Sequence, residues 1–307
     1  MIKIFKKYLS NIIKKVFSEE IEKELILKAK NLSKKNKQIK KLKNLSEVEF
    51  RVFSQWGEDG IIDWVINKFP NIPKSFLEIG TQDYKESNTR FLLINKNWDG
   101  FLIEGNDKEV KKIKSQRIYW KHQLKVKNEF ITKENINNVI KKLNVPKKLG
   151  LLSLDIDGVD YWILKKLTIL EPSIVICEYN SLYGLNKSIT VPYKKDFDRS
   201  KEHYSNLYYG ASIKAFIDLM KTKKYFLLGT NTAGNNAFFM RNNFLKEVNK
   251  IIEEKKIFTS KFRESRNKNG NLTFLSKKES LLLIQNQFFI DLNDNKRKKL
   301  INIKLNN

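Results

Sequence analysis

The segment "LLSLDIDGVDYWIL", residues 151–164, places three carboxylates close together. Asp155, Asp157 and Asp160 are residues of the type that bind Ca²⁺ in loops, or that meet a ligand where a buried strand ends. An EF-hand loop needs a glutamate about six residues after its glycine, and Leu164 stands at that place. We therefore interpret the segment as an apolar strand that ends in acids, turns, and starts a helix at Asp160.

Other apolar runs of the chain also end in acids. The runs "SFLEIGT" (75–81), "DGFLIEGN" (99–106) and "PSIVICEYN" (172–180) each have the pattern of a buried strand followed by a polar turn. In an open α/β sheet, ligands bind at the carboxyl ends of the strands. A single acid there can equally cap the next helix. Five together predict a ligand site at one edge of the sheet: Glu78, Glu104, Asp155, Asp157 and Glu178.

Apolar strands alternate with helical patterns between residues 51 and 242, and this order predicts the fold. The expected strands lie at 75–81, 99–106, 118–126, 149–157, 172–180, 225–231 and 236–242. The expected helices lie at 86–96, 107–116, 132–143, 160–167 and 212–223, with Thr132 and Ser212 as capping residues. We predict a Rossmann-like, doubly wound, mostly parallel seven-stranded sheet with a C-terminal antiparallel hairpin strand.

The segments that flank this domain are basic and lack its alternation of strands and helices. Residues 1–50 form a basic helical N-terminal extension, and residues 243–307 a basic, mostly helical C-terminal appendage. Residues 1–17 place apolar side chains on one helical face and lysines on the other. Such a helix can contact an anionic membrane, its own domain or a partner helix.

The net charge of +26 favours anionic partners, namely nucleic acid, an anionic membrane face or phosphorylated substrates. The joint abundance of lysine, asparagine and isoleucine is also what AT-rich coding DNA produces. The lysines are distributed along the whole chain, whereas a nucleic-acid interface is expected to gather them. The charge alone therefore leaves the partner open.

A single cysteine, Cys177, precludes a disulfide within the chain and favours a reducing compartment. With one cysteine and two histidines, a structural zinc site is not expected. The sequence has no apolar run of the roughly 20 residues that span a bilayer and no signal-peptide pattern. We predict a cytoplasmic protein, with the inner face of the membrane as an alternative location.

Gly80 and Glu104 limit the cofactor that the strand ends can bind. Gly80 allows close approach to the backbone after the first strand, and an acid that ends the second strand can accept the hydroxyls of a ribose. The chain contains neither G-x-G-x-x-G nor a P-loop. An adenosine ligand without phosphates fits this combination, and S-adenosylmethionine is the common one.

The chain resembles the FkbM-type family of S-adenosylmethionine-dependent methyltransferases, which are bacterial enzymes that often modify carbohydrates. The resemblance covers about residues 52–242 and consists of "SQWGEDGII", "FLEIGT", "ESNTRFLL", "WDGFLIEGN", "LSLDIDGVDYWIL", "VICEYNS" and "LLGTNTAGNNAFFMRN" in order. The chain departs from the family pattern in two places. Asp157 and Asp160 replace longer acids, and no second glycine follows Gly80.

The resemblance implies roles for the matching residues. Glu104 would bind the ribose, Asp155 would lie near the methionine ammonium, and the segment with Gln55 and Asp59 would cover the cofactor. His122, in "KHQ" at the expected end of the third strand, would be structural or would face the adenine. The implied cofactor-binding set is Gln55, Asp59, Glu78, Gly80, Asn88, Glu104 and Asp155.

Methyl transfer to an alcohol requires a base or a metal that activates the hydroxyl. Asp155, Glu178 and Asn180 resemble the ligand trio of magnesium-dependent O-methyltransferases, and oxygen ligands suit Mg²⁺ or another divalent cation. The metal-free alternative uses Asp157 or His203 as the catalytic base.

The loop 181–210 is long, basic and rich in tyrosine, as lids over active sites often are. We predict O-methylation of a sugar, a glycan precursor or a related polar small molecule. A nucleic-acid methyltransferase and a non-catalytic, membrane-associated binding protein on the same fold are the alternatives.

Overall fold

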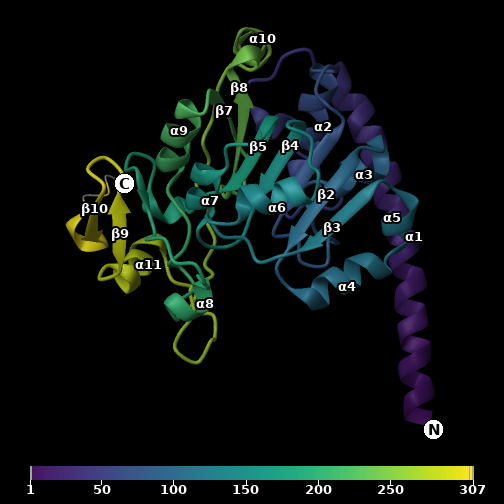
Figure 1. Cartoon of the computed structure of the whole chain (residues 1–307). Coiled ribbons are helices and arrows are strands. Elements are labelled where there is room, and N and C mark those ends of the chain that lie inside the picture. Colours follow the sequence, from purple (N-terminus) through teal and green to yellow (C-terminus); the bar gives the residue numbers. More distant parts are fainter. Residues whose placement is uncertain (1, 304, 306–307) are drawn as a thin grey trace.

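The structure is a computed structural model that describes residues 2–303 and 305, with side chains from residue 20 onward. Its described part is built around a seven-stranded sheet with the order β3-β2-β1-β4-β5-β8-β7 (Figure 1). All neighbouring pairs are parallel except those of β8, which runs antiparallel to both β5 and β7. This confirms the predicted mostly parallel sheet and its hairpin. The strands are β1 Ser75–Ile79, β2 Asp99–Glu104, β3 Leu124–Asn128, β4 Lys148–Leu154, β5 Glu171–Glu178, β7 Tyr225–Thr230 and β8 Asn236–Arg241.

Helices cover both faces of this sheet because alternate residues of its strands point to opposite sides. In β1, Leu77 packs into a core with α6 (Ile136–Lys142), α7 (Asp160–Lys166) and α9 (Ile213–Thr222). Its neighbour Phe76 packs into the opposite core. The helices of that second core are α2 Glu58–Lys68, α3 Arg90–Lys96, α4 Asp107–Ser115 and α5 Arg117–Lys121.

Three predicted element boundaries are wrong. The segment 118–126, expected to be one strand, contains most of the short helix α5 and then the start of β3. Its apolar residues resemble a single strand because Ile118 of α5 and Leu124 of β3 pack into the same core. The helix expected from Thr132 begins at Ile136, and the Thr132 hydroxyl accepts a hydrogen bond from the backbone of Asn135 at 3.2 Å in the turn that precedes it. The helix expected at 86–96 begins only at Arg90. Ser212 caps α9 as predicted, accepting a hydrogen bond from the backbone of Ala215.

The C-terminal segment is only partly helical. It contains α10 (Leu245–Ile251) and α11 (Lys277–Ile284), and in addition an unpredicted hairpin of β9 (Phe288–Asp291) and β10 (Lys296–Lys299). Strand β9 pairs with β6 (Ile189–Thr190), which lies inside the loop 181–210. The hydroxyl of Tyr208 in that loop also donates to the backbone carbonyl of Phe288. The C-terminal segment therefore holds the predicted lid in place.

The N-terminal helix α1 (Ile2–Gln38) extends well beyond the body of the protein (Figure 1). The side chains of residues 1–17, on which the membrane prediction depends, lie outside the described ones. Among the described helices, none combines the length and the apolar character that crossing a bilayer requires. The C-terminal half of α1 packs on the domain, where the Ser33 hydroxyl donates to the Asp63 carboxylate at 2.6 Å.

Asp63 fixes this contact from a fully buried position in α2. Its carboxylate also accepts a hydrogen bond from Asn67 at 3.0 Å and pairs with the Lys96 ammonium at 2.9 Å. We predict that Asp63→Asn lowers the free energy of unfolding by about 2–4 kcal/mol, because the Lys96 ammonium loses its charged acceptor. Urea denaturation measures this, with the exposed Asp196→Asn as the matched control. A variant as stable as the wild type would contradict it.

Candidate active site at the carboxyl ends of the strands

The carboxyl ends of β1 and β4 touch each other through the backbone. Gly80, directly after β1, has a φ of +82°, and a Cβ added there would lie 1.7 Å from the carbonyl oxygen of Asp155. A side chain at this position would thus collide with the neighbouring strand end. The sequence predicts that the missing side chain of Gly80 makes space for a ligand. In the structure, the carbonyl group of Asp155 occupies the space that a side chain would need. Gly80 still lines both cavities described next.

Glu104, at the end of β2, lies in a cavity of about 620 Å³ that we name the Glu104 cavity. One carboxylate oxygen accepts hydrogen bonds from the backbone of Thr81 (3.0 Å) and Gln82 (2.8 Å), and the other accepts from Asn106 (2.9 Å). An ionised carboxylate has about four acceptor positions. Apolar side chains line much of the remaining wall: Ile79, Ile103, Phe130, Ile131, Ile156, Val159 and Phe197.

A second cavity of about 510 Å³, which we name the acidic cavity, adjoins the first. Both cavities are lined by Gly80, Gln82, Asp155 and Asp157. The described lining of the acidic cavity contains two arginines, Arg199 and Arg263, against seven carboxylates: Glu78, Asp83, Glu86, Asp155, Asp157, Glu178 and Glu264. This cavity is therefore acidic although the whole chain is strongly basic.

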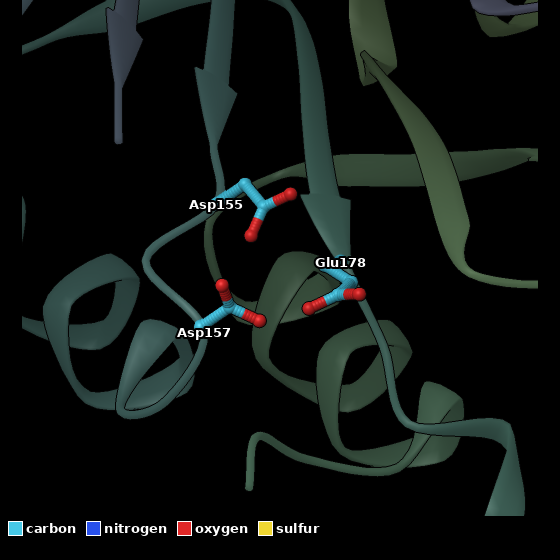
Figure 2. A group of neighbouring side chains, drawn as sticks. All are labelled: Asp155, Asp157 and Glu178. Carbon is cyan, nitrogen blue, oxygen red and sulfur yellow. The ribbon is translucent and has the colours of Figure 1, made fainter. Parts of the chain in front are cut away.

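The carboxylates of Asp155, Asp157 and Glu178 converge in the acidic cavity (Figure 2). Each offers an oxygen, and these oxygens lie within 4.8 Å of one another. Burial raises the pKa of Asp155 well above its usual range, and the charges of Asp157 and Asp160 raise it further. Burial likewise raises the pKa of Glu178, with Asp155 as the next cause. Such a group can bind a cation, because a positive charge would offset both the burial and the mutual repulsion.

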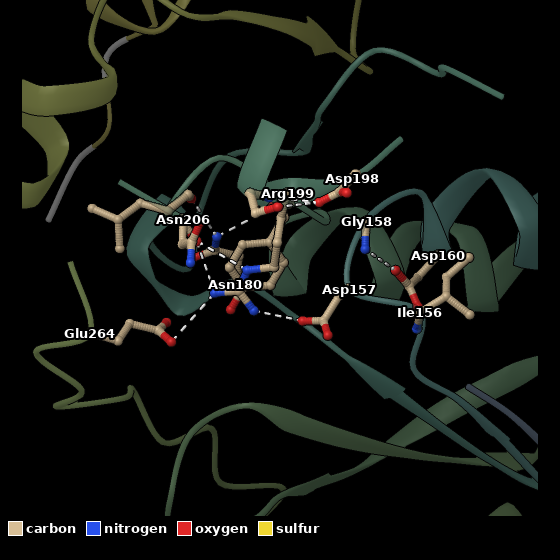
Figure 3. Close-up of polar contacts among 12 residues, drawn as sticks. Ile156, Asp157, Gly158, Asp160, Asn180, Asp198, Arg199, Asn206 and Glu264 are labelled. Carbon is tan, nitrogen blue, oxygen red and sulfur yellow. Dashed lines mark hydrogen bonds and ion pairs between the residues drawn. The ribbon is translucent and has the colours of Figure 1, made fainter. Parts of the chain in front are cut away.

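Arg199 brings a positive charge into contact with this cluster (Figure 3). Its guanidinium donates to Asp157 at 2.6 Å, lies 3.4 Å from a Glu264 oxygen and stacks 3.9 Å from the centre of the Tyr209 ring. Two further donors bind the backbone carbonyl of Asn206. Arg199 therefore connects the loop 181–210 to the acids and to the C-terminal segment.

Asp160 shapes the turn that carries Asp155 and Asp157. Its carboxylate accepts hydrogen bonds from the backbone of Ile156 at 2.8 Å and Gly158 at 3.0 Å (Figure 3). Burial raises the pKa of Asp160 to about 6. As the sequence predicts, α7 starts at Asp160. Its side chain stabilises the preceding turn by accepting these two backbone hydrogen bonds.

Several predicted cofactor contacts lie in the acidic cavity, and Asp59 does not. Gln55 and Asn88 line it, and Asn88 also donates to Ser153 at 3.1 Å. Glu78 lines it as well, while its carboxylate accepts hydrogen bonds from Ser87 and from the backbone of Asn88. Asp59 is 1% exposed and lines neither cavity, so its prediction as a cofactor contact is wrong.

The predicted third metal ligand and the two histidines lie elsewhere. The Asn180 amide donates to the carbonyls of Leu207 and Tyr209 and accepts from Leu182, so its polar atoms already serve the backbone. His203 lines neither cavity, and its Nδ1 lies 2.7 Å from the Ser205 hydroxyl.

His122 precedes β3 and therefore lies at the edge opposite the strand ends, which contradicts an adenine-facing position.

Sequence reasoning missed the residues that complete the acidic cavity from distant segments. Arg199 carried no signal beyond its place in a basic loop, and Glu264 lies in a segment without periodicity. Trp56 and Phe262 line the cavity too, with stacked rings whose centres are 4.8 Å apart. Because these contacts join residues that are 42 positions apart or more, no local pattern could have identified them.

No known family model and no curated protein sequence matches the chain. Solved structures do match, and several of them are named as methyltransferases. The N-terminal domain of EvdMO1 with SAH bound has 8% identity over 69% of this chain and 94% of that chain, with a TM-score of 0.40. An O-methyltransferase from Bacillus cereus in complex with SAH has 15% identity over 54% and 72%, with a TM-score of 0.36. The methyltransferase domain of bacterial CtHen1 has 12% identity over 59% and 96%, with a TM-score of 0.38.

These likenesses are too distant to assign an activity to this chain. The resemblance to the FkbM-type family stays a hypothesis, because it rests on sequence motifs that no family model matches. The function is therefore inferred from the site itself.

The buried position of Asp59 predicts a pH dependence of stability. One of its oxygens accepts hydrogen bonds from the backbone of Val52, Phe53 and Ser54 and from the Ser54 hydroxyl, while the other finds no partner in the described chain. Burial raises the pKa of Asp59 to about 6. The folded protein thus binds a proton near pH 5 that the unfolded chain does not bind, so stability rises as pH falls from 7 to 5.

We predict that Asp59→Asn removes about 1 kcal/mol of this gain, because asparagine keeps the acceptor oxygen and does not titrate. Urea unfolding of the wild type and the variant at pH 5, 6 and 7 measures the difference. Asp196→Asn, at an exposed position, should retain the wild-type slope. Equal slopes for wild type and Asp59→Asn would contradict the prediction.

Proposed function

We propose that the protein is an S-adenosylmethionine-dependent methyltransferase that methylates a hydroxyl of a sugar, a glycan precursor or a related polar small molecule. One observation carries the proposal. An acid that ends β2 lines an apolar-walled cavity, and this cavity shares Asp155 and Asp157 with a second cavity rich in carboxylates. The first suits a nucleoside, and the second suits a cation and a hydroxyl-rich acceptor.

The Glu104 cavity has the chemistry for adenosine. Its volume lies in the usual range for small-molecule sites, and Phe130, Ile156 and Val159 offer apolar surface for a flat base. The Glu104 carboxylate has about one acceptor position left after its three backbone hydrogen bonds. A ribose with two hydroxyls would therefore displace one amide, from Thr81 or Gln82.

The acidic cavity suits the charged end of the same cofactor. When bound, S-adenosylmethionine would supply a methyl group on a positively charged sulfur, next to a positively charged ammonium. Asp155 lies where the two cavities meet, and a carboxylate there favours a cation by direct attraction. Gly80 leaves the backbone at this point free of side-chain bulk.

The remainder of the acidic cavity suits a polar acceptor. The stacked pair Trp56 and Phe262 offers ring faces to a sugar, and Asn235 and Asn236 offer amide groups. Asp157 lies in this cavity and is the base that we propose for a metal-free reaction. The Arg199 guanidinium occupies one of its oxygens, so the other oxygen would accept the proton.

The three converging carboxylates also fit a divalent cation. Asp155, Asp157 and Glu178 are hard oxygen donors of the kind that Mg²⁺ and Ca²⁺ prefer. A cation held there would lower the pKa of a bound hydroxyl. We propose Asp157 as the third ligand in place of Asn180, whose amide atoms already bind the backbone.

The charge of the acidic cavity favours this acceptor over nucleic acid. Seven carboxylates among its described residues would repel a phosphate backbone. A non-catalytic binding protein would retain the cofactor site and release no S-adenosylhomocysteine with any acceptor.

We predict that the wild type binds S-adenosylmethionine and that Glu104→Gln binds it at least about 10-fold more weakly, because a charged acceptor of a ribose hydroxyl is lost. Isothermal titration calorimetry measures both affinities. Glu247→Gln, an exposed acid of α10, is the control. Absence of wild-type binding would overturn the methyltransferase proposal, and full retention by Glu104→Gln would overturn the ribose assignment.

For the metal, we predict that Mg²⁺ or Ca²⁺ binds the protein and that Glu178→Gln or Asp157→Asn weakens it at least about 10-fold, since each removes a charged ligand. Calorimetric titration with either ion measures this, again with Glu247→Gln as control. Asn180→Ala should lower stability and leave ion affinity unchanged. An ion affinity that depends on Asn180 and not on Asp157 would restore the original trio.

A further inference from the structure

We propose that the cavity between α1 and the helices α3 to α5 binds an organic anion that carries a phosphate group. This cavity, which we name the basic cavity, has a volume of about 670 Å³. Its described lining holds two acids, Glu22 and Asp83, against six cations: Lys23, Lys85, Arg90, Lys112, Arg117 and Lys121. The site does not depend on the methyltransferase proposal.

Arg90 is the buried member of this set, with 5% of its surface exposed. Its guanidinium donates to the Tyr84 carbonyl at 3.0 Å and to Gln116 at 2.9 Å, and lies 3.3 Å from a Glu22 oxygen. Its Nε is buried and finds no hydrogen-bond partner among the described residues. The guanidinium also lies 5.0 Å from the centre of the Phe53 ring. Burying a charged group is costly, and an anion in the cavity that Arg90 lines would add a second negative partner beside Glu22.

The positive field of the cavity also acts on His122, which is another of its lining residues. The pKa of His122 is lowered, first by burial and then by the charges of Lys121 and Arg90. Lys85 and Lys112 have exposed side chains that pair with Asp83 and Glu109. Exposed pairs are weak, so both ammonium groups can turn toward an incoming anion at little cost.

The composition of the wall indicates what kind of anion fits. Three isoleucines, Ile26, Ile94 and Ile118, line the cavity together with the cations. A free inorganic ion would use only the charges, whereas an organic molecule would also cover this apolar surface. A phosphate monoester carries nearly two negative charges and three acceptor oxygens, which matches a cavity where cations outnumber acids three to one.

The position of the basic cavity places its ligand beside the candidate active site. Asp83 lines both the basic and the acidic cavity, and the Gln116 amide donates to the Asp83 carbonyl at 2.6 Å. The same chemistry can come from a soluble phosphorylated metabolite or from the phosphate headgroup of a lipid. The experiment needs one arm for each source.

The variant Lys112→Glu/Lys121→Glu tests the site, because both lysines are exposed and line the cavity. Lys246→Glu/Lys250→Glu on α10 changes the net charge equally at exposed positions outside the cavity, and serves as the matched control. Calorimetry with glucose 6-phosphate tests the soluble source. Flotation with phosphatidylcholine vesicles, with and without phosphatidic acid, tests the lipid source at physiological ionic strength.

We expect one probe to bind the wild type and the control, and to bind the cavity variant at least about 10-fold more weakly. Binding of glucose 6-phosphate indicates a soluble ligand, and binding of phosphatidic acid vesicles alone indicates a lipid. Absence of binding to either probe, or equal weakening in both double variants, overturns the proposal. Unchanged S-adenosylmethionine affinity of the cavity variant separates this result from the outcome for the proposed function.

Discussion

The close approach of two strand ends determines the geometry of the site. Where β1 and β4 finish, the backbone of Gly80 meets the carbonyl of Asp155 with no space for a Cβ. This contact aligns the turn after β1 with the turn after β4, so Glu104 and Asp155 open into adjoining cavities. A side chain at residue 80 would push these turns apart, whatever ligand the protein binds.

The succession of strands and helices along the chain and the acids at the strand ends could be predicted from the sequence, because both are local properties. Each apolar run reveals a buried strand, and the rule that ligands bind at carboxyl ends identifies Glu104, Asp155 and Glu178 without coordinates. Local patterns failed where one apolar stretch covers two elements, as at Ile118 and Leu124. They failed again at Asp59, whose carboxylate accepts hydrogen bonds from the backbone of the preceding loop.

The parts of the site that could not be predicted depend on contacts between distant segments. Arg199 reaches Asp157 from the loop 181–210, part of which pairs with β9. The basic cavity is a similar case, since its lysines come from three separate stretches and show no cluster in the sequence. Charged residues that are spread along the sequence are thus brought together by the fold, with acids around one cavity and cations around another.

The late position of Phe262 and Glu264 has a consequence for synthesis on the ribosome. All residues that line the Glu104 cavity have been made once Phe197 is added, whereas Phe262, Glu264 and other residues of the acidic cavity follow later. Chains grow from the N-terminus at a finite rate, and folding can begin before they are complete. The lining of the Glu104 cavity is therefore encoded earlier in the chain than the lining of the acidic cavity, which is complete only at Leu272.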